Sequence, residues 1–185
     1  MYESLSPYWI ACFSKKPDDF SQWMLYGDSG CGIAIGFDLS KFPQQPRLEV
    51  AEVVYDRESQ EKLLEAHVKE RLNCANWAWT FAYDIARIKQ DSFLSESEVR
   101  LMQFLSYPEA WEDELDFQSK AGNISHFATS NSIVPFTKQS FEPAAVVEVR
   151  LGPRSNSPKN IQQMRTILRQ LGFKSIVNTS AIVMS

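Results

Sequence analysis

The chain has 185 residues, a net charge of −4 and 44% hydrophobic residues, an ordinary composition for a folded protein with a sizeable core. The acidic balance argues against general nucleic-acid binding, because phosphate neutralisation requires a basic surplus. The three widely spaced cysteines lack metal-ligand spacing and are typical of reduced thiols in the cytoplasm. No apolar run approaches the ~20 residues of a membrane span, so we expect no membrane partner.

The first forty residues predict a strand, a short helix, a turn and a second strand. An aromatic and β-branched run over 8–14 is typical of a strand, and Asp18 or Asp19 is placed to cap the helix that follows. Residues 27–30 predict a glycine turn. The glycines of the second strand, 31–38, indicate close approach by another backbone or a ligand.

The middle of the chain predicts a third strand over 48–55 and then helices. The stretch 57–89 reads as a long helix with a bend near Asn73, amphipathic before the bend and apolar around most of its circumference after it. Ser95 and Glu98 form a capping-box pattern that predicts another helix, ended by Pro108. In the first half of the long helix, the residues expected to face the core of the protein are Leu63, Leu64, Val68 and Leu72.

The remainder predicts strands and one helix. Residues 111–117 are read as a strand, with a helical turn as the alternative, and short strands are expected over 124–136. A strand–helix–strand unit with parallel strands ends the chain, made of 144–151, a helix between Pro158 and Gly172, and 175–178. We therefore predict a single α+β domain over residues 1–185, with a central twisted sheet covered by a helix pair.

Several local patterns point to chemistry only weakly. Gly27-Asp28-Ser29-Gly30 copies the nucleophile string of trypsin-like proteases, but both histidines follow Ser29, against the chain order of that triad. The loop 152–159, with Arg154, precedes a helix and is either an anion site or a plain loop capped by Ser157. The acidic cluster 111–116 is either a pair for acid–base work or a solvated acidic face.

The segment from Cys12 to Asp38 resembles the bacterial domain-of-unknown-function family 2971. The residues that carry the resemblance are an FS strand end, a helix with W-x-x-Y, a glycine turn and an I-G-F-D strand. Weaker resemblances follow in the family's order at 111–118, 133–136, 149–153 and 180–182. Where the family has a second glutamate, an arginine and a late proline, this chain has Asp116, Gln118 and Val183, and the family's usual upstream region has no counterpart.

The family's pattern is in turn similar to ADP-ribosyltransferase-like domains. That similarity implies NAD or another nucleotide as ligand, with Glu114 and Asp116 as catalytic acids. It further implies that Trp23 or Tyr26 stacks on the ligand and that Ser14 hydrogen-bonds to it. The remaining candidate ligand-binding residues are Asp28 and Arg154.

Three function hypotheses remain open from the sequence. The first is a nucleotide- or NAD-binding domain related to ADP-ribosyltransferases. The second is a non-catalytic module that binds a protein partner, as in a defence or toxin-like system; an exposed apolar patch at an unpaired strand would favour it. The third is a hydrolase that uses Glu114 and Asp116.

Overall fold

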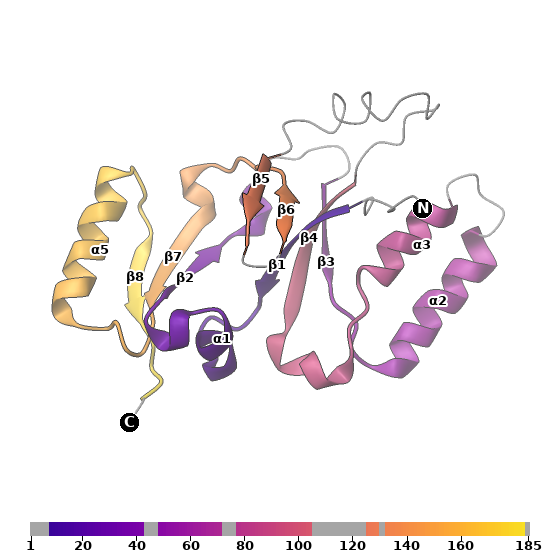
Figure 1. Ribbon diagram of the computed structural model, residues 1–185, viewed down its shortest axis with the longest axis horizontal. Helices are drawn as coiled ribbons and strands as arrows, with labels where there is room; N and C mark the ends of the chain where they lie inside the picture. Colours follow the sequence, from indigo (N-terminus) through magenta and orange to yellow (C-terminus); the bar gives the residue numbers. More distant parts are fainter. Residues whose placement is uncertain (1–7, 43–47, 72–76, 105–124, 130–131, 184–185) are drawn as a thin grey trace. The chain divides into compact units, whose positions relative to one another are not determined.

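The computed structural model describes residues 8–42, 48–71, 77–104, 125–129 and 132–183 (Figure 1). The chain divides into two compact units, each assembled from two separate stretches. Unit 1 comprises residues 1–13 and 45–139, and unit 2 comprises residues 14–44 and 140–185. The prediction of a single domain is not tested by this division and stays a prediction.

Unit 1 contains a three-stranded sheet in the order β1-β4-β3, with bounds Tyr8–Ser14, Glu98–Phe104 and Leu48–Glu52. β3 and β4 are antiparallel, with Val50 opposite Leu101. Strands β5 (Ser125–Ala128) and β6 (Ile133–Phe136) form a separate antiparallel hairpin, which confirms the short strands expected there.

The helix that the capping-box pattern predicted over this segment is wrong, because the structure has strand β4 there. A short 3-10 helix over Asp91–Glu96 ends at Ser97, whose φ of 47° lies in the left-handed region, and the chain then extends. β4 is the central strand of its sheet, and its neighbours Leu101 and Met102 are both buried. A strand buried on both faces has no alternation of polar and apolar residues, so its pattern is easily mistaken for a helix.

The long helical stretch is two helices, α2 (Arg57–Arg71) and α3 (Trp77–Ile85), which pack against each other. Asp56 caps α2, accepting a hydrogen bond from the Ser59 backbone at 2.8 Å. The predicted inward face is partly wrong: Val68 is 49% exposed, whereas its neighbour His67 is buried. The apolar residues predicted around most of α3 do not bury it on all sides, since Phe81 and Ile85 are exposed.

Unit 2 is built on a second three-stranded sheet in the order β2-β7-β8, with bounds Ile33–Phe37, Val146–Leu151 and Ile176–Thr179. β2 and β7 are antiparallel, and β7 and β8 are parallel, as the strand–helix–strand pattern predicted. A β-bulge interrupts the β2–β7 register, because Gly36 lies opposite Glu148 but Phe37 lies opposite Val146, which leaves Val147 unpaired.

The helix α5 (Pro158–Gln170) packs on this sheet and closes the core of unit 2. Its start and end follow the predicted signals, because Ser157 caps it at the Asn160 backbone and Gly172 follows it with a φ of 79°. Leu168 packs with Val146, Val149 and Val177 in the buried cluster. Leu171, which follows the last residue of α5, is 63% exposed.

The remaining helical elements of unit 2 are α1 (Phe20–Leu25) and 3-10 helices at Asp28–Gly30, Leu39–Lys41 and Pro143–Ala145. The mixed α+β class is confirmed, but the strands are divided among several small sheets rather than joined in one central sheet. Each helix in the described part of the chain is too short or too polar to cross a membrane.

Candidate functional site

The carboxylate of Asp18 gathers residues from both ends of unit 2. Its Oδ1 accepts hydrogen bonds from the Trp23 indole and the Ser180 hydroxyl, each at 2.7 Å. Its Oδ2 accepts from the Ala181 backbone at 2.7 Å and lies 3.7 Å from Arg150. These contacts connect residues more than 160 positions apart, and they join motifs from the start and the end of the family resemblance.

These contacts hold Asp18 as a carboxylate. Partial burial raises the pKa of Asp18, but the hydrogen bonds from Trp23, Ser180 and Ala181 and the charge of Arg150 outweigh burial and leave the pKa below its ordinary value. Trp23 is only 3% exposed, so its ring is not available to stack on a ligand. The structure therefore gives the predicted ligand residue Trp23 a packing role.

A second set of contacts ties the loop after β7 to the glycine turn before β2. The backbone N–H of Gly152 donates to Gly32 at 3.0 Å, and that of Arg154 donates to Gly30 at 2.9 Å. Ser155 donates its hydroxyl to the Cys31 carbonyl. Two of the loop's N–H groups are thereby occupied by protein carbonyls, which weakens the case for a backbone anion site over 152–159.

The side chains of Tyr26, Asp28 and Arg154 are all exposed, and Tyr26 is 72% exposed. The contact between Arg154 and Gly30 brings the two segments that carry these side chains to one region of unit 2. Ser14, at the end of β1, is also exposed, and its hydroxyl accepts from the Lys16 backbone at 3.1 Å. Of the predicted ligand residues, Tyr26, Asp28 and Arg154 thus lie on two segments that a backbone hydrogen bond joins.

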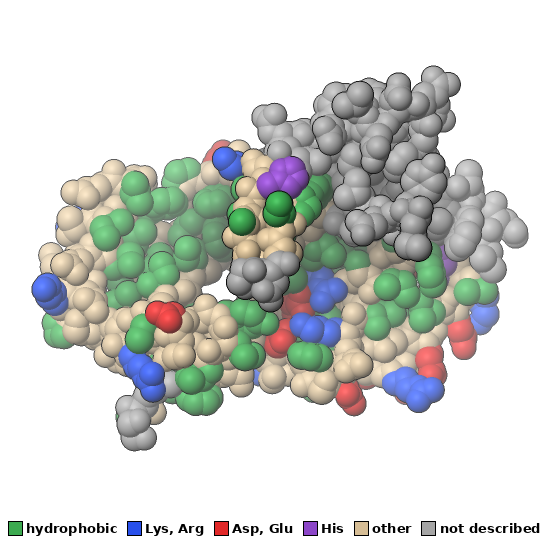
Figure 2. Space-filling model, viewed as in Figure 1, with side chains coloured by type: hydrophobic (Ala, Val, Ile, Leu, Met, Phe, Trp, Pro, Cys, Tyr) green, Lys and Arg blue, Asp and Glu red, His purple; other side chains and the backbone are tan. Residues whose placement is uncertain are grey.

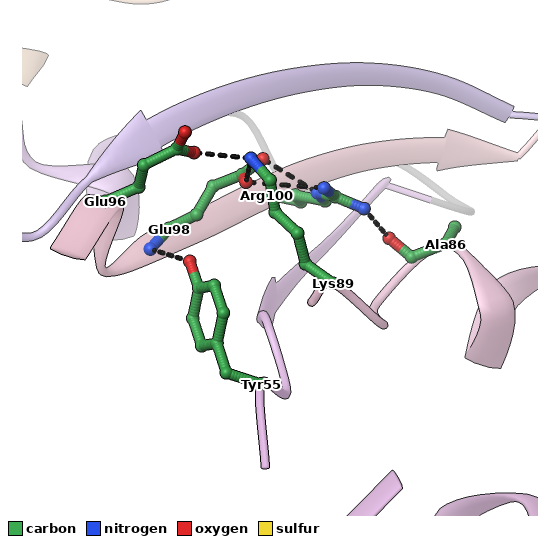
Figure 3. Close-up of polar contacts among 6 residues, drawn as sticks. All are labelled: Tyr55, Ala86, Lys89, Glu96, Glu98 and Arg100. Atoms are coloured by element: carbon green, nitrogen blue, oxygen red, sulfur yellow. Dashed lines mark hydrogen bonds and ion pairs between the residues drawn. The ribbon is translucent and has the colours of Figure 1, made fainter. Parts of the chain in front are cut away.

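Unit 1 contains a network of charged side chains around Glu98 (Figure 3). Glu98 is 5% exposed and is contacted by Arg100 at 2.8 Å and Lys89 at 2.9 Å. Lys89 also pairs with Glu96, and Arg100 donates to the Ala86 carbonyl. The Tyr55 hydroxyl accepts from the Glu98 backbone at 2.9 Å.

The charges in this network balance, with two carboxylates and two cations. Burial raises the pKa of Glu98, but the hydrogen bonds from Arg100, Cys12 and Lys89 more than reverse this and lower it to about 2. Burial and the neighbouring Glu98 raise the pKa of the Cys12 thiol to about 11. A protonated thiol and saturated charges are typical of a structural network and unsuited to nucleophilic chemistry.

Comparison with known proteins identifies one segment of the chain. A family model described as protein of unknown function (DUF2971) matches residues 22–101. This segment, which is less than half of the chain, is therefore similar to the DUF2971 family. No curated protein and no solved structure matches the chain. The resemblance noted in the sequence is therefore supported over this segment.

The DUF2971 match includes part of α1, the glycine turn and β2 from unit 2, and β3, α2, α3 and part of β4 from unit 1. The weaker motifs at 149–153 and 180–182 lie beyond the match, although unit 2 packs them against the glycine turn and Asp18. Glu114, Asp116 and the strand predicted over 111–117 lie outside the described residues, as do the predicted bend near Asn73 and Pro108. The catalytic roles of Glu114 and Asp116 stay predictions.

The DUF2971 segment also contains a buried pair that the sequence did not reveal. His67 on α2 and Asp84 on α3 lie 2.8 Å apart, with side chains 1% and 7% exposed. The His67 Nε2 atom is buried and has no hydrogen-bond partner in the described structure. The 17-residue separation spans two helices, so no spacing rule in the sequence indicates this contact.

The described residues contain no group of three or more His, Cys, Asp or Glu side chains arranged to hold a metal ion. In the His67–Asp84 pair the carboxylate can orient the imidazole, but both side chains are buried, 1% and 7% exposed. The exposed residues Tyr26, Asp28 and Arg154, together with β2 at the end of the unit 2 sheet, are therefore the better candidates for function.

Proposed function

We propose that this chain is a non-catalytic interaction module that binds an extended segment of another protein along β2. The observation that carries the proposal is the position of β2 at the end of the β2-β7-β8 sheet. The outer edge of a terminal strand presents backbone N–H and C=O groups that another strand can pair with. Such pairing supplies affinity through main-chain hydrogen bonds and specificity through side chains on alternate positions.

Two isoleucines of β2 give this edge an apolar face. Ile35 lies opposite Val149, which lies opposite Val177, so all three point to the side that α5 covers. Ile33 is two residues away on the same side. Ile33 and Ile35 are nevertheless 45% and 47% exposed. Figure 2 shows hydrophobic side chains at the surface of this unit beside α5.

The sequence of β2 also lacks the features that protect an edge strand. Sheets of monomeric proteins usually place lysine, proline or an inward-pointing charge on an exposed edge. β2 reads Ile-Ala-Ile-Gly-Phe and has neither a charged residue nor a proline. An unprotected apolar edge is typical of a surface that is covered by a partner.

Site-directed photo-crosslinking tests this proposal. A photo-reactive residue at position 33 should crosslink a protein from a lysate of the source organism, whereas the same residue at the exposed position 171 should not. The captured protein is then purified and titrated against the chain. Ile35→Lys should weaken binding at least tenfold, because a charge would be buried at the new strand pair. Leu171→Lys, at a position 63% exposed on the same unit, is the matched control.

Equal binding of the purified partner by the wild type and Ile35→Lys would overturn the proposal. So would the same crosslinking pattern at positions 33 and 171, because it would mean that the contact is not made through β2. Circular dichroism of each variant confirms that the fold is retained before binding is compared.

Nucleotide binding, with NAD as the candidate cofactor, is the second candidate function. The observation that favours it is the exposed set Tyr26, Asp28 and Arg154, whose segments meet at the Arg154–Gly30 hydrogen bond. An exposed tyrosine ring can stack on a base or a nicotinamide ring, and an arginine can donate two hydrogen bonds to a phosphate. ADP-ribosyl transfer would additionally require the predicted acid Glu114.

A thermal-shift titration with NAD separates the two candidates. A ligand that binds only the folded chain adds about 2.7 kcal/mol of stability at a hundredfold excess over its dissociation constant. We expect a saturable shift with the wild type that is lost in Tyr26→Ala and retained in Tyr83→Phe. An unchanged midpoint at millimolar NAD would exclude this candidate and leave the β2 proposal unaffected.

A further inference from the structure

Unit 2 contains an open cleft of about 620 Å³ that the proposed functions do not use. Pro143 and Ala144 of a 3-10 helix, the start of β7, and the segment from Gly172 to Ile176 form its walls. Sites for small molecules commonly enclose about 300–1,000 Å³ and are lined mostly by apolar groups with a few polar ones. The size and lining of this cleft fall within that class.

The β-bulge in β7 provides part of the apolar floor. The register passes from Gly36–Glu148 to Phe37–Val146, so Val147 has no partner on β2 and lies in the cleft, 41% exposed. β-Bulges commonly redirect a side chain beside a binding site. Ile176, at the start of β8, lies in the same cleft and is 64% exposed. Two large apolar side chains are thus turned toward this space rather than into the core.

One charged residue of the lining is placed to receive an anion. Two lysines and one glutamate, Lys41, Lys174 and Glu142, line the cleft, and among the described residues only one of the lysines is already paired with a carboxylate. Lys41 lies 3.4 Å from Asp38 and 3.3 Å from the Ala144 carbonyl. Lys174 forms no ion pair with any described residue, so its charge is available to a ligand.

We propose that this cleft is a binding site for a small carboxylate with an aliphatic body. The aliphatic part packs on Val147 and Ile176, and the carboxylate pairs with Lys174. This site is separate from the β2 edge, because none of its lining residues belongs to β2.

The test compares hexanoate, hexanol and hexylamine, which share an aliphatic chain and differ in charge. Each is titrated against the 185-residue chain while the methyl resonances of Val146, Val147 and Ile176 are followed. Hexanoate should shift these resonances saturably and bind most tightly, and hexylamine most weakly. Lys174→Glu should weaken hexanoate at least tenfold. Lys159→Glu, at an exposed position on α5 outside the lining, should change it less than twofold.

Binding of hexylamine as tight as that of hexanoate would overturn the proposal, because Glu142 would then dominate the recognition. Equal shifts of the Ile33 and Ile35 methyls would overturn it as well, since they indicate binding to any apolar surface. Loss of hexanoate binding in both lysine variants would also overturn the proposal, because the net charge of the protein, and not Lys174, would then explain the binding. Val147→Ala, which shortens the floor without adding charge, should weaken all three ligands by a similar factor.

Discussion

At the residue scale, Trp23 is the candidate ligand residue whose assignment the structure changes most. Its indole donates to Asp18 at 2.7 Å, and its side chain is buried. Trp23→Phe keeps an aromatic ring but removes this donor. We expect a loss of about 1–2 kcal/mol in the free energy of unfolding, measured by urea denaturation followed by circular dichroism. A loss below about 0.5 kcal/mol would mean that the hydrogen bond to Asp18 is not needed for stability.

Glu98 should make the protein sensitive to acid. Its pKa in the folded chain is about 2, below the ordinary value of 4.5, so the folded state binds its proton less tightly than the unfolded state. The stability that Glu98 contributes is therefore fully present above pH 4.5 and is lost as the pH falls from about 4.5 to about 2. A shift of this size corresponds to about 3 kcal/mol.

Thermal melts between pH 7 and pH 2 check this expectation. Glu98→Gln should lower the midpoint at pH 7, because Arg100 loses its carboxylate partner, and should flatten the further decline in acid. Glu61→Gln is the matched control, because Glu61 pairs with Arg57 at the surface and is 59% exposed. An equal decline in acid for the wild type and Glu98→Gln would show that other carboxylates dominate.

At the element scale, Gly152 fixes how the end of β7 meets the glycine turn. A Cβ at this position would overlap the Gly30 carbonyl and lie 3.0 Å from the Gly32 carbonyl, and both obstacles are backbone atoms. Gly152→Ala should therefore cost about 2 kcal/mol or more, because the loop and the turn must separate. Gly36→Ala is a milder comparison, since its Cβ would meet Glu148 at 3.2 Å. Equal stability of the two variants in urea would contradict this reading.

The elements that the sequence predicted correctly are those with strong local signals. β1, α5 with its Ser157 cap, and the parallel pair β7 and β8 follow from alternation, capping residues and glycine placement. β4 was mistaken for a helix because a central strand buried on both faces has no alternation. Its Ser95 and Glu98 pattern matched a capping box by chance, and Glu98 instead anchors a charged network.

The candidate site was less predictable than the elements, because its contacts join distant parts of the chain. Asp18 meets Ser180 across 162 residues, and Ser155 meets Cys31 across 124. The motifs of the family resemblance did indicate which segments matter. They did not distinguish a buried packing residue such as Trp23 from an exposed one such as Tyr26, because both are aromatic residues on one short helix and its cap.

At the scale of the whole molecule, the chain passes between the two units at residues 13–14, 44–45 and 139–140. Each unit has its own sheet, and each is closed by two stretches that are separated in sequence by part of the other unit. If one unit unfolds, the two stretches of the other are joined by a long flexible loop or end in a free segment. Holding those stretches together then costs more loop-closure entropy. We therefore expect the units to unfold together, as the prediction of a single domain requires.

Hydrogen exchange of the 185-residue chain with and without Gly152→Ala tests this cooperativity. Gly152 lies in unit 2, so the variant weakens the β2-β7-β8 sheet directly. If the units unfold together, amides of Val50 and Leu101 in unit 1 should lose as much protection as that of Val149 in unit 2. Unchanged protection in β3 and β4, with a loss confined to β7 and β8, would divide the chain into two domains. The matched variant Glu98→Gln perturbs unit 1 instead. In a single cooperative domain it should lower the protection of amides in both units as well, because the site of the substitution does not decide which amides are exposed.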